Sequence, residues 1–164
     1  MWEPWMRLAI DEARAAAQDE DVPVGAIITD GEQVIATGRN LREVIQDPTA
    51  HAELVAIRNA AQHRGNWHLD GLTLVVTLEP CAMCAGAIVL SRLDRVVYGA
   101  TDPKAGATRS LYNIADDPRL NHRADIVTGV LEDECGEILR SFFKERRLRA
   151  KAKKQSSAIP PQDG

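Results

Sequence analysis

Three residues with the chemistry of zinc ligands stand in two short motifs, His51-Ala52-Glu53 and Pro80-Cys81-Ala82-Met83-Cys84. Two cysteines three positions apart at a helix start place both sulfur atoms on one face, and the dipole of the first turn favours thiolates. Pro80 suits such an entry, because proline is tolerated in the first turn. His51 would supply the third ligand, and a three-ligand zinc site leaves its fourth position to water. The pattern therefore predicts a hydrolytic zinc site.

Glu53 is the one acid in these motifs, and hydrolysis needs such a group beside the metal. Zinc lowers the pKa of a bound water from about 15.7 towards 7, and a neighbouring carboxylate can accept the released proton. A metalloprotease of the His-Glu-x-x-His type is excluded, because Val55 stands four residues after His51. A redox Cys-x-x-Cys and a four-ligand structural site are weaker interpretations. The first does not call for a His-x-Glu motif, and the remaining cysteine, Cys135, lies in a helical pattern 51 residues past Cys84.

Hydrophobic periodicity indicates the elements that must position these motifs. It predicts helices over 5–18, 50–63, 81–91 and 132–151, and strands over 24–29, 33–38, 72–77, 95–100 and 125–130. Asp30-Gly31 indicates a hairpin between the first two strands, and Asp47-Pro48-Thr49 indicates a helix start. The order of the elements predicts an α/β layered domain, in which the metal lies between two helix N-termini.

The composition is typical of a single intracellular domain. With 164 residues, 45% of them hydrophobic, the chain can bury a sizeable core, so we expect a catalytic domain over 1–150. Residues 151–164 read as a tail that is first basic and then disordered in composition. Three cysteines, two of them in the metal pattern, argue against a disulfide scaffold. No stretch approaches the roughly 18 apolar residues of a membrane helix. We expect a cytoplasmic protein with no membrane partner.

Four longer motifs carry a resemblance to a family of enzymes. They are Val22-Pro23-Val24-Gly25-Ala26, Asp47-Pro48-Thr49-Ala50-His51-Ala52-Glu53, Thr77-Leu78-Glu79-Pro80-Cys81 and Asn121-His122-Arg123. They are similar to motifs of the zinc-dependent nucleoside and nucleobase deaminases, and among these the chain most resembles the bacterial tRNA adenosine deaminases. The resemblance runs from about residue 5 to residue 147. It implies a three-layer α/β/α fold of the cytidine-deaminase type with a five-stranded mixed sheet.

The resemblance also implies a reaction, the hydrolytic deamination of adenosine to inosine at the wobble position of a tRNA anticodon. One Zn²⁺ per subunit would be held by His51, Cys81 and Cys84, and Glu53 would carry protons from water to the base and to the departing ammonia. The expected partners are the anticodon stem-loop of an arginine tRNA and a second subunit in a homodimer. The residues that would shape the pocket are Val24, Asn40, Ala52 and Pro80.

A basic segment near the C-terminus is a candidate for RNA contact. Residues 140–154 hold eight Lys and Arg residues against Glu145 alone, a net charge of +7, so the rest of the chain carries −11 of the total of −4. Such a segment is either a solvated helix end or a phosphate-binding surface. The resemblance favours the second interpretation, with Arg146 as a contact. Phe142 or Phe143 would be a platform for an extruded base, with at least one of the two in the core.

The loop after the fourth predicted strand is a second candidate. Asp-Pro and Gly ordinarily mark a turn, but in similar enzymes this loop lines the nucleic-acid groove, so Asp102 and Lys104 are expected to contact the RNA. Arg109 departs from the family pattern, which commonly has glycine there. If the family has glycine there because the backbone adopts a positive φ, arginine at this position would be strained. Alternatively, the Arg109 side chain adds a phosphate contact.

Two alternative functions remain open. A deaminase of a free base or nucleoside, of the guanine or cytosine type, would share all four site residues, but its activity should not depend on the basic segment. A noncatalytic zinc-bearing RNA-binding module is the rival from another class. Replacing Glu53 by alanine distinguishes it, because only an enzyme has activity to lose.

Overall fold

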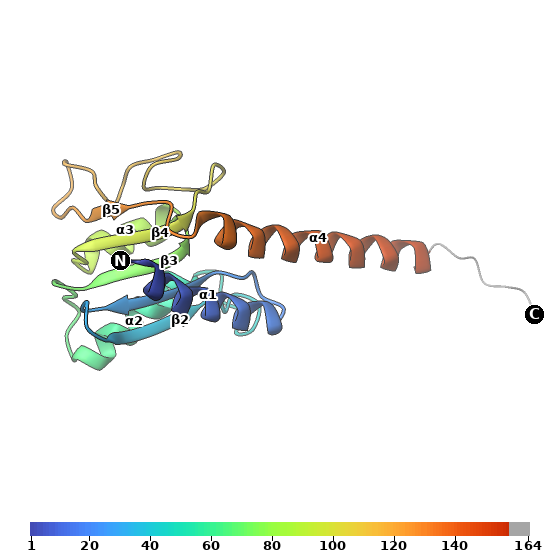
Figure 1. The fold of residues 1–164 in the computed structure, drawn as a ribbon, viewed down its shortest axis with the longest axis horizontal. Helices are drawn as coiled ribbons and strands as arrows, with labels where there is room; N and C mark the ends of the chain where they lie inside the picture. The colour runs from blue at the N-terminus through green and yellow to red at the C-terminus, as the bar shows by residue number, and fades with distance from the viewer. Residues whose placement is uncertain (158–164) are drawn as a thin grey trace, which may run out of the picture.

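The computed structural model describes residues 1–157, and they are built around one sheet with the strand order β2-β1-β3-β4-β5 (Figure 1). The strands are β1 (Gly25–Thr29), β2 (Val34–Arg39), β3 (Thr73–Leu78), β4 (Arg95–Ala100) and β5 (Asp125–Val127). β1 pairs antiparallel with both β2 and β3, whereas β4 pairs parallel with β3 and β5. The central strands are almost wholly buried, as expected where both faces of a sheet are covered. The five-stranded mixed sheet is confirmed.

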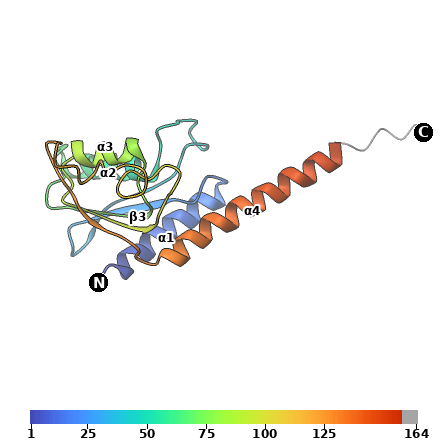
Figure 2. The same ribbon diagram turned by 90° about the horizontal axis from the view of Figure 1, so that it is seen from above.

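Helices cover both faces of this sheet (Figure 2). α1 (Glu3–Gln18) and α4 (Glu132–Ser157) lie on one face, and α2 (Ala52–Arg64) and α3 (Ala82–Leu90) lie on the other. Successive strand residues point to opposite faces, so each strand contributes to two cores. In β3, Leu74 and Val76 pack in the core under α2 and α3, and Val75 packs in the core under α1. The three-layer α/β/α architecture is therefore confirmed.

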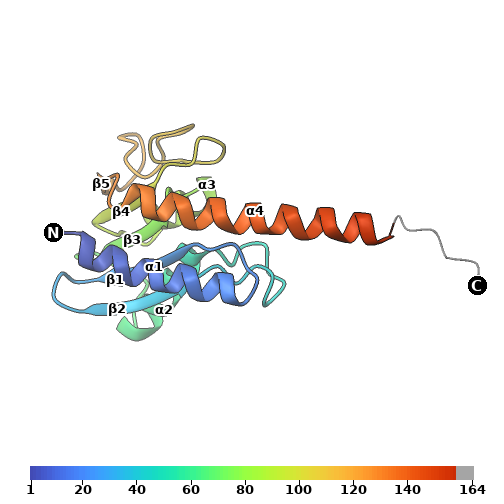
Figure 3. The same cartoon turned by 45° about the vertical axis from the view of Figure 1, so that its right-hand side comes forward.

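α4 is longer than the sequence predicts. Its first turns lie beside α1, where Arg7 pairs with Glu134 at 3.3 Å, and its later turns extend past the sheet (Figure 3). It ends at Ser157 and not near Lys151, because Lys, Arg, Glu and Ala are strong helix formers even without a core to cover. Residues 155–157 of the predicted disordered tail are thus helical, and residues 158–164 lie outside the described part.

The remaining boundaries differ little from the prediction. β5 ends at Val127, short of the predicted 130, because Gly129 has a φ of +77° that breaks the strand conformation. None of the helices formed by residues 1–157 is long and apolar enough to cross a membrane.

Gly38 sets the distance between β2 and the helix that carries the first motif. A Cβ atom placed on Gly38 would lie 2.5 Å from the amide nitrogen of Ala56, well inside the contact distance of ordinary side chains. Only glycine permits this close approach of α2 to the strand. The position of the first turn of α2 therefore depends on it.

Candidate metal centre and active site

The predicted metal ligands lie close together at the N-termini of two helices. His51 is the N-cap of α2, Cys81 is the N-cap of α3, and Cys84 lies in the first turn of α3. Neither N-cap side chain makes a capping hydrogen bond to the backbone of its helix, so both can serve as ligands. Pro80 precedes the N-cap, so it lies just before α3 and not in its first turn. The positive ends of two helix dipoles thus favour negatively charged sulfur at this place.

The three ligand atoms fit a tetrahedral metal ion. Nδ1 of His51 lies 3.6 Å from Sγ of Cys81 and 3.6 Å from Sγ of Cys84, and the three atoms lie within 4.8 Å of one another. Bonds of about 2.0 Å to nitrogen and about 2.3 Å to sulfur at the tetrahedral angle put nitrogen and sulfur about 3.6 Å apart. Across residues 1–157 no second group of three such side chains converges in this way. The group could hold a metal ion with little rearrangement.

The two thiols share one negative charge in the metal-free site. Hydrogen bonding with the Cys84 thiol lowers the pKa of Cys81 to about 4, and the same interaction, together with burial, raises the pKa of Cys84. The hydrogen bond with Cys81 raises the pKa of His51. A bound metal would replace the proton that Cys84 retains, since a metal binds the thiolate form.

Glu53 is buried beside the ligands, in the first turn of α2. Glu53 is only 4% exposed, and burial raises the pKa of its carboxyl group. A carboxyl group whose pKa is raised holds a proton more readily than an exposed carboxyl group does. The arrangement can therefore provide a proton carrier beside the three candidate ligands.

A cavity of about 850 Å³ opens onto this group. The volume is within the range of pockets that enclose small molecules. Three sides are formed by the start of α2, the loop 101–105 and the first half of α4, where Leu139 and Phe143 face the cavity. Asn40, just after β2, is buried at its edge; its Oδ1 accepts the amide hydrogen of Arg42 at 3.0 Å, and its side-chain NH₂ donates to no residue among 1–157. The cavity thus offers a polar contact next to the metal ligands.

Comparison with known proteins gives a consistent relationship. A family profile described as MafB19-like deaminase matches residues 1–147. A tRNA-specific adenosine deaminase of Bacillus subtilis (strain 168) is 48% identical over 154 residues, which are 94% of this chain and 96% of that protein. This chain belongs to the tRNA-specific adenosine deaminase family.

Solved structures agree with membership of the tRNA-specific adenosine deaminase family. A chain from a study of A-to-I editing by tRNA:A34 deaminases at the wobble position of transfer RNA has a TM-score of 0.79 and 44% identity, and the match covers 82% of this chain and 97% of that one. A guanine deaminase from Bacillus subtilis is less similar, with a TM-score of 0.59 and 38% identity over 60% of this chain and 64% of that one. The fold is shared by both, and the fuller match is to the tRNA:A34 deaminase.

Most substrate residues predicted from the resemblance to this family lie at the cavity. Its lining includes Val24, Asn40, Ala52, Asp102, Lys104 and Phe143. Pro80 is not in the lining; it is buried behind the wall, and its carbonyl accepts the amide hydrogen of Ala107 at 2.8 Å. Pro80 therefore contacts the loop that follows β4 and not the cavity itself.

Phe142 and Arg146 are not brought to the cavity. They lie on another side of α4, where the guanidinium of Arg146 sits 5.0 Å from the centre of the Phe142 ring and donates to the carbonyl of Glu20 at 3.4 Å. Consecutive helix residues point about 100° apart, so Phe143 faces the cavity and Phe142 does not. The prediction that one of the two phenylalanines belongs to the core is wrong, because Phe142 is half-buried and Phe143 is 39% exposed.

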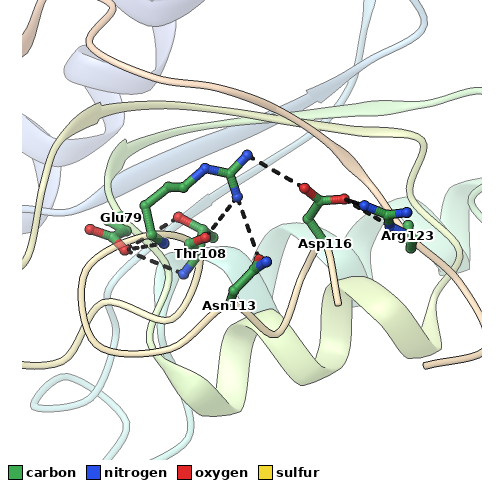
Figure 4. Close-up of polar contacts among 6 residues, drawn as sticks. Glu79, Thr108, Asn113, Asp116 and Arg123 are labelled. Atoms are coloured by element: carbon green, nitrogen blue, oxygen red, sulfur yellow. Dashed lines mark hydrogen bonds and ion pairs between the residues drawn. The ribbon is translucent and has the colours of Figure 1, made fainter. Parts of the chain in front are cut away.

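The strain predicted at Arg109 is also absent, since its φ is not positive. Its guanidinium donates to the carbonyl of Thr108 at 2.9 Å and pairs with Asp116 at 3.5 Å, and Asp116 in turn pairs with Arg123 at 2.9 Å (Figure 4). An additional phosphate contact by Arg109 stays a prediction.

The sequence reading missed Glu79 as a functional candidate. Glu79 lines the cavity, and its carboxylate accepts hydrogen bonds from residues 23–31 positions later in the chain. The available signal was a charged residue placed between a buried strand and the Pro80-Cys81 motif of the family.

Proposed function

We propose that this protein is a zinc-dependent hydrolase that converts adenosine to inosine at the wobble position of a tRNA anticodon. The observation that carries the proposal is the cavity that opens on His51, Cys81 and the buried Glu53. Membership of the tRNA-specific adenosine deaminase family supports adenosine in tRNA as the substrate.

Zinc would be held by Nδ1 of His51 and by the Sγ atoms of Cys81 and Cys84. The match between their 3.6 Å separations and zinc coordination geometry supports this choice of metal. When bound, zinc leaves one position to water and lowers the pKa of that water towards about 7.

Glu53 would carry the protons of the reaction. Deamination replaces the amino group on C6 of adenine with an oxygen atom from water and releases ammonia. The Glu53 carboxylate would accept one proton from the attacking water and pass it to the ring nitrogen. It would then accept the second proton from the new hydroxyl group on C6 and pass it to the amino group, which leaves as ammonia. Its burial and the raised pKa of its carboxyl group support this exchange in both directions.

The base would enter the cavity extruded from its stack. Asn40 would hydrogen-bond the nucleoside through its side-chain NH₂, while Val24 and Ala52 shape the walls. Asp102, Lys104 and Phe143 line the same cavity, which supports contacts of these residues with the target and its neighbouring nucleotides.

The later turns of α4 would contact the phosphate backbone. Residues 140–154 have a net charge of +7, and these turns lie in a helix that extends beyond the sheet (Figure 1). Arg146 belongs to this surface and not to the base pocket. Such contacts predict binding that weakens steeply with added salt.

We also propose an arginine tRNA as the substrate, a cytoplasmic location and a homodimer, each from the family resemblance. Exposed apolar side chains support a subunit interface, among them Met83, Leu90, Leu111 and Tyr112. Light scattering of the zinc-loaded protein should give twice the mass of the chain, and a monomer at micromolar concentration would contradict the dimer.

The test is a substrate panel. Zinc-quantified protein is incubated with an anticodon stem-loop that carries a wobble adenosine, and in parallel with free adenosine, cytidine and guanine. Inosine in the hairpin, without ammonia release from the free compounds, supports the proposal. Release only from a free base would make the protein a salvage deaminase, and RNA binding without any turnover would make it a noncatalytic module.

A further inference from the structure

Glu79 has a buried carboxylate that no cation neutralises. The residue is 2% exposed, and none of the ion pairs within residues 1–157 includes it. Removing a charged group from water is costly, so such a group persists only where hydrogen bonds replace its hydration. The structure must therefore provide an unusually complete set of donors.

The donors come from one irregular loop (Figure 4). Glu79 accepts backbone N–H groups of Asp102 at 3.0 Å, Thr108 at 3.3 Å, Arg109 at 3.0 Å and Ser110 at 3.0 Å. The hydroxyl groups of Thr108 and Ser110 donate to it as well. Burial acts to raise the pKa of Glu79, but the hydrogen bonds from Ser110 and the backbone amides outweigh burial and hold that pKa at about 2. All of these partners are hydrogen-bond donors, so their arrangement favours the ionised carboxylate.

The same loop is attached to the segment that carries Cys81. The amide of Ala107 donates to the carbonyl of Pro80 at 2.8 Å, and Gly106 lies opposite Cys81 in an antiparallel bridge. A side chain on Gly106 would collide with the Glu79 carboxylate, so the loop and the Glu79-Pro80-Cys81 segment pack without intervening space. The loop thus has no regular secondary structure but is held at several points along one side.

This loop also forms a wall of the reaction cavity. Residues 101–105 line the cavity together with His51, Glu53 and Cys81. The Glu79 carboxylate binds the loop at two places. One is Asp102, within the residues that line the cavity, and the other is residues 108–110, which follow them. The shape of this wall therefore depends on Glu79, which borders the cavity but is not one of the three candidate metal ligands.

We propose that Glu79 is a positioning residue for substrate recognition, whose buried carboxylate fixes loop 101–110 in the shape that receives the target nucleotide and its neighbours. The inference rests on the proposed function only for the identity of the substrate. A carboxylate is required because every partner is a donor and each of its two oxygens accepts more than one hydrogen bond. Glutamine has the same shape but places an NH₂ group against N–H donors. The variant should therefore lose the hydrogen bonds either to Asp102 or to residues 108–110.

The experiment compares Glu79→Gln with Asp117→Asn in the zinc-loaded protein. Asp117 is a matched control, because its ion pair with Arg119 also lowers its pKa to about 2, but it accepts no hydrogen bond from loop 101–110. We expect Glu79→Gln to retain full zinc, to raise KM for the anticodon stem-loop by about tenfold or more, and to change kcat much less. Asp117→Asn should have the KM of the wild type. Ser110→Ala, which removes one donor, should show a smaller rise in KM.

Hydrogen exchange gives a readout that needs no turnover. In Glu79→Gln the amides of residues 102 and 108–110 should exchange faster than in the wild type, while those of β3 and α2 are unchanged. Unaltered exchange in this loop, or a Glu79→Gln variant whose KM equals that of the wild type, would overturn the proposal. Loss of zinc or general loss of folded protein with an unchanged KM would also overturn it, since Glu79 would then be only structural. Wild-type protein that fails to form inosine would instead refute the proposed function, and the exchange result would still decide the role of Glu79.

Discussion

Replacing Gly38 with alanine should displace α2 and disable the site, although Gly38 itself does not line the cavity. The added Cβ would lie 2.5 Å from the amide nitrogen of Ala56, where ordinary contacts begin at 3.4 Å. Both atoms belong to or adjoin the backbone, so no side chain can rotate away, and α2 must move by about 1 Å. His51 and Glu53 begin this helix and must move with it.

The expected magnitudes follow from this shift. Overpacking against backbone costs up to about 3 kcal/mol. For a chain of this size that lowers Tm by roughly 6–12 °C. A displacement of about 1 Å at a reacting group can cost about 100-fold in rate. We therefore expect Gly38→Ala to be folded but less stable, with kcat/KM on the anticodon stem-loop reduced by about two orders of magnitude.

Gly86→Ala is the matched control for this assay. Gly86 lies in α3, and an added Cβ would meet nothing within 4 Å. Because alanine is favoured over glycine inside a helix by about 1 kcal/mol, this variant should be slightly more stable than the wild type. Thermal unfolding and inosine formation are measured for both zinc-loaded variants. A Gly38→Ala protein with the Tm and activity of the wild type would refute the argument that close packing of α2 positions the site.

Three further predictions concern charge, the pocket and the metal. The pKa of Glu79 in the folded protein is about 2 against 4.5 ordinarily, so its stabilisation is present above pH 4.5 and is lost as the pH falls towards 2. In denaturant titrations, the stability difference between wild type and Glu79→Gln should shrink by about 2 kcal/mol between pH 6 and pH 3, and a constant difference would contradict the assignment. Phe143→Ala should raise KM for the stem-loop more than Phe142→Ala does, since only Phe143 lines the cavity; equal effects would disprove that orientation. Zinc at 100 times its Kd should stabilise the metal-free protein by about 2.7 kcal/mol in thermal unfolding, and Cys84→Ala should abolish this, so persistence in the variant would exclude Cys84 as a ligand.

The sequence predicted that His51, Cys81 and Cys84 lie close together, and the structure confirms this, because the signals for these positions are local. His51 and Cys81 each end an extended segment and begin a helix, and such junctions are marked by short motifs. The same applies to the strands, since β4 runs from Arg95 to Ala100 as its hydrophobic pattern predicts. Patterns of this kind report which face of an element is buried.

The features that the sequence did not predict depend on distant contacts. Glu79 meets partners up to 31 residues later in an irregular loop, and no periodicity describes such a loop. Phe142 and Phe143 are adjacent in sequence, but which of them faces the cavity depends on the rotation of α4 against α1 and the sheet. The end of α4 beyond Lys151 has no core to cover, so a hydrophobic pattern could not mark it.

The central claim is that this site deaminates a wobble adenosine with Glu53 as the proton carrier. The most direct measurement is single-turnover inosine formation in an anticodon stem-loop by wild type and Glu53→Gln, matched for zinc content and for stem-loop binding. We predict inosine with the wild type and a loss of at least about 100-fold with Glu53→Gln, in line with the usual size of acid and base catalysis. A Glu53→Gln protein that forms inosine at the wild-type rate would contradict the account.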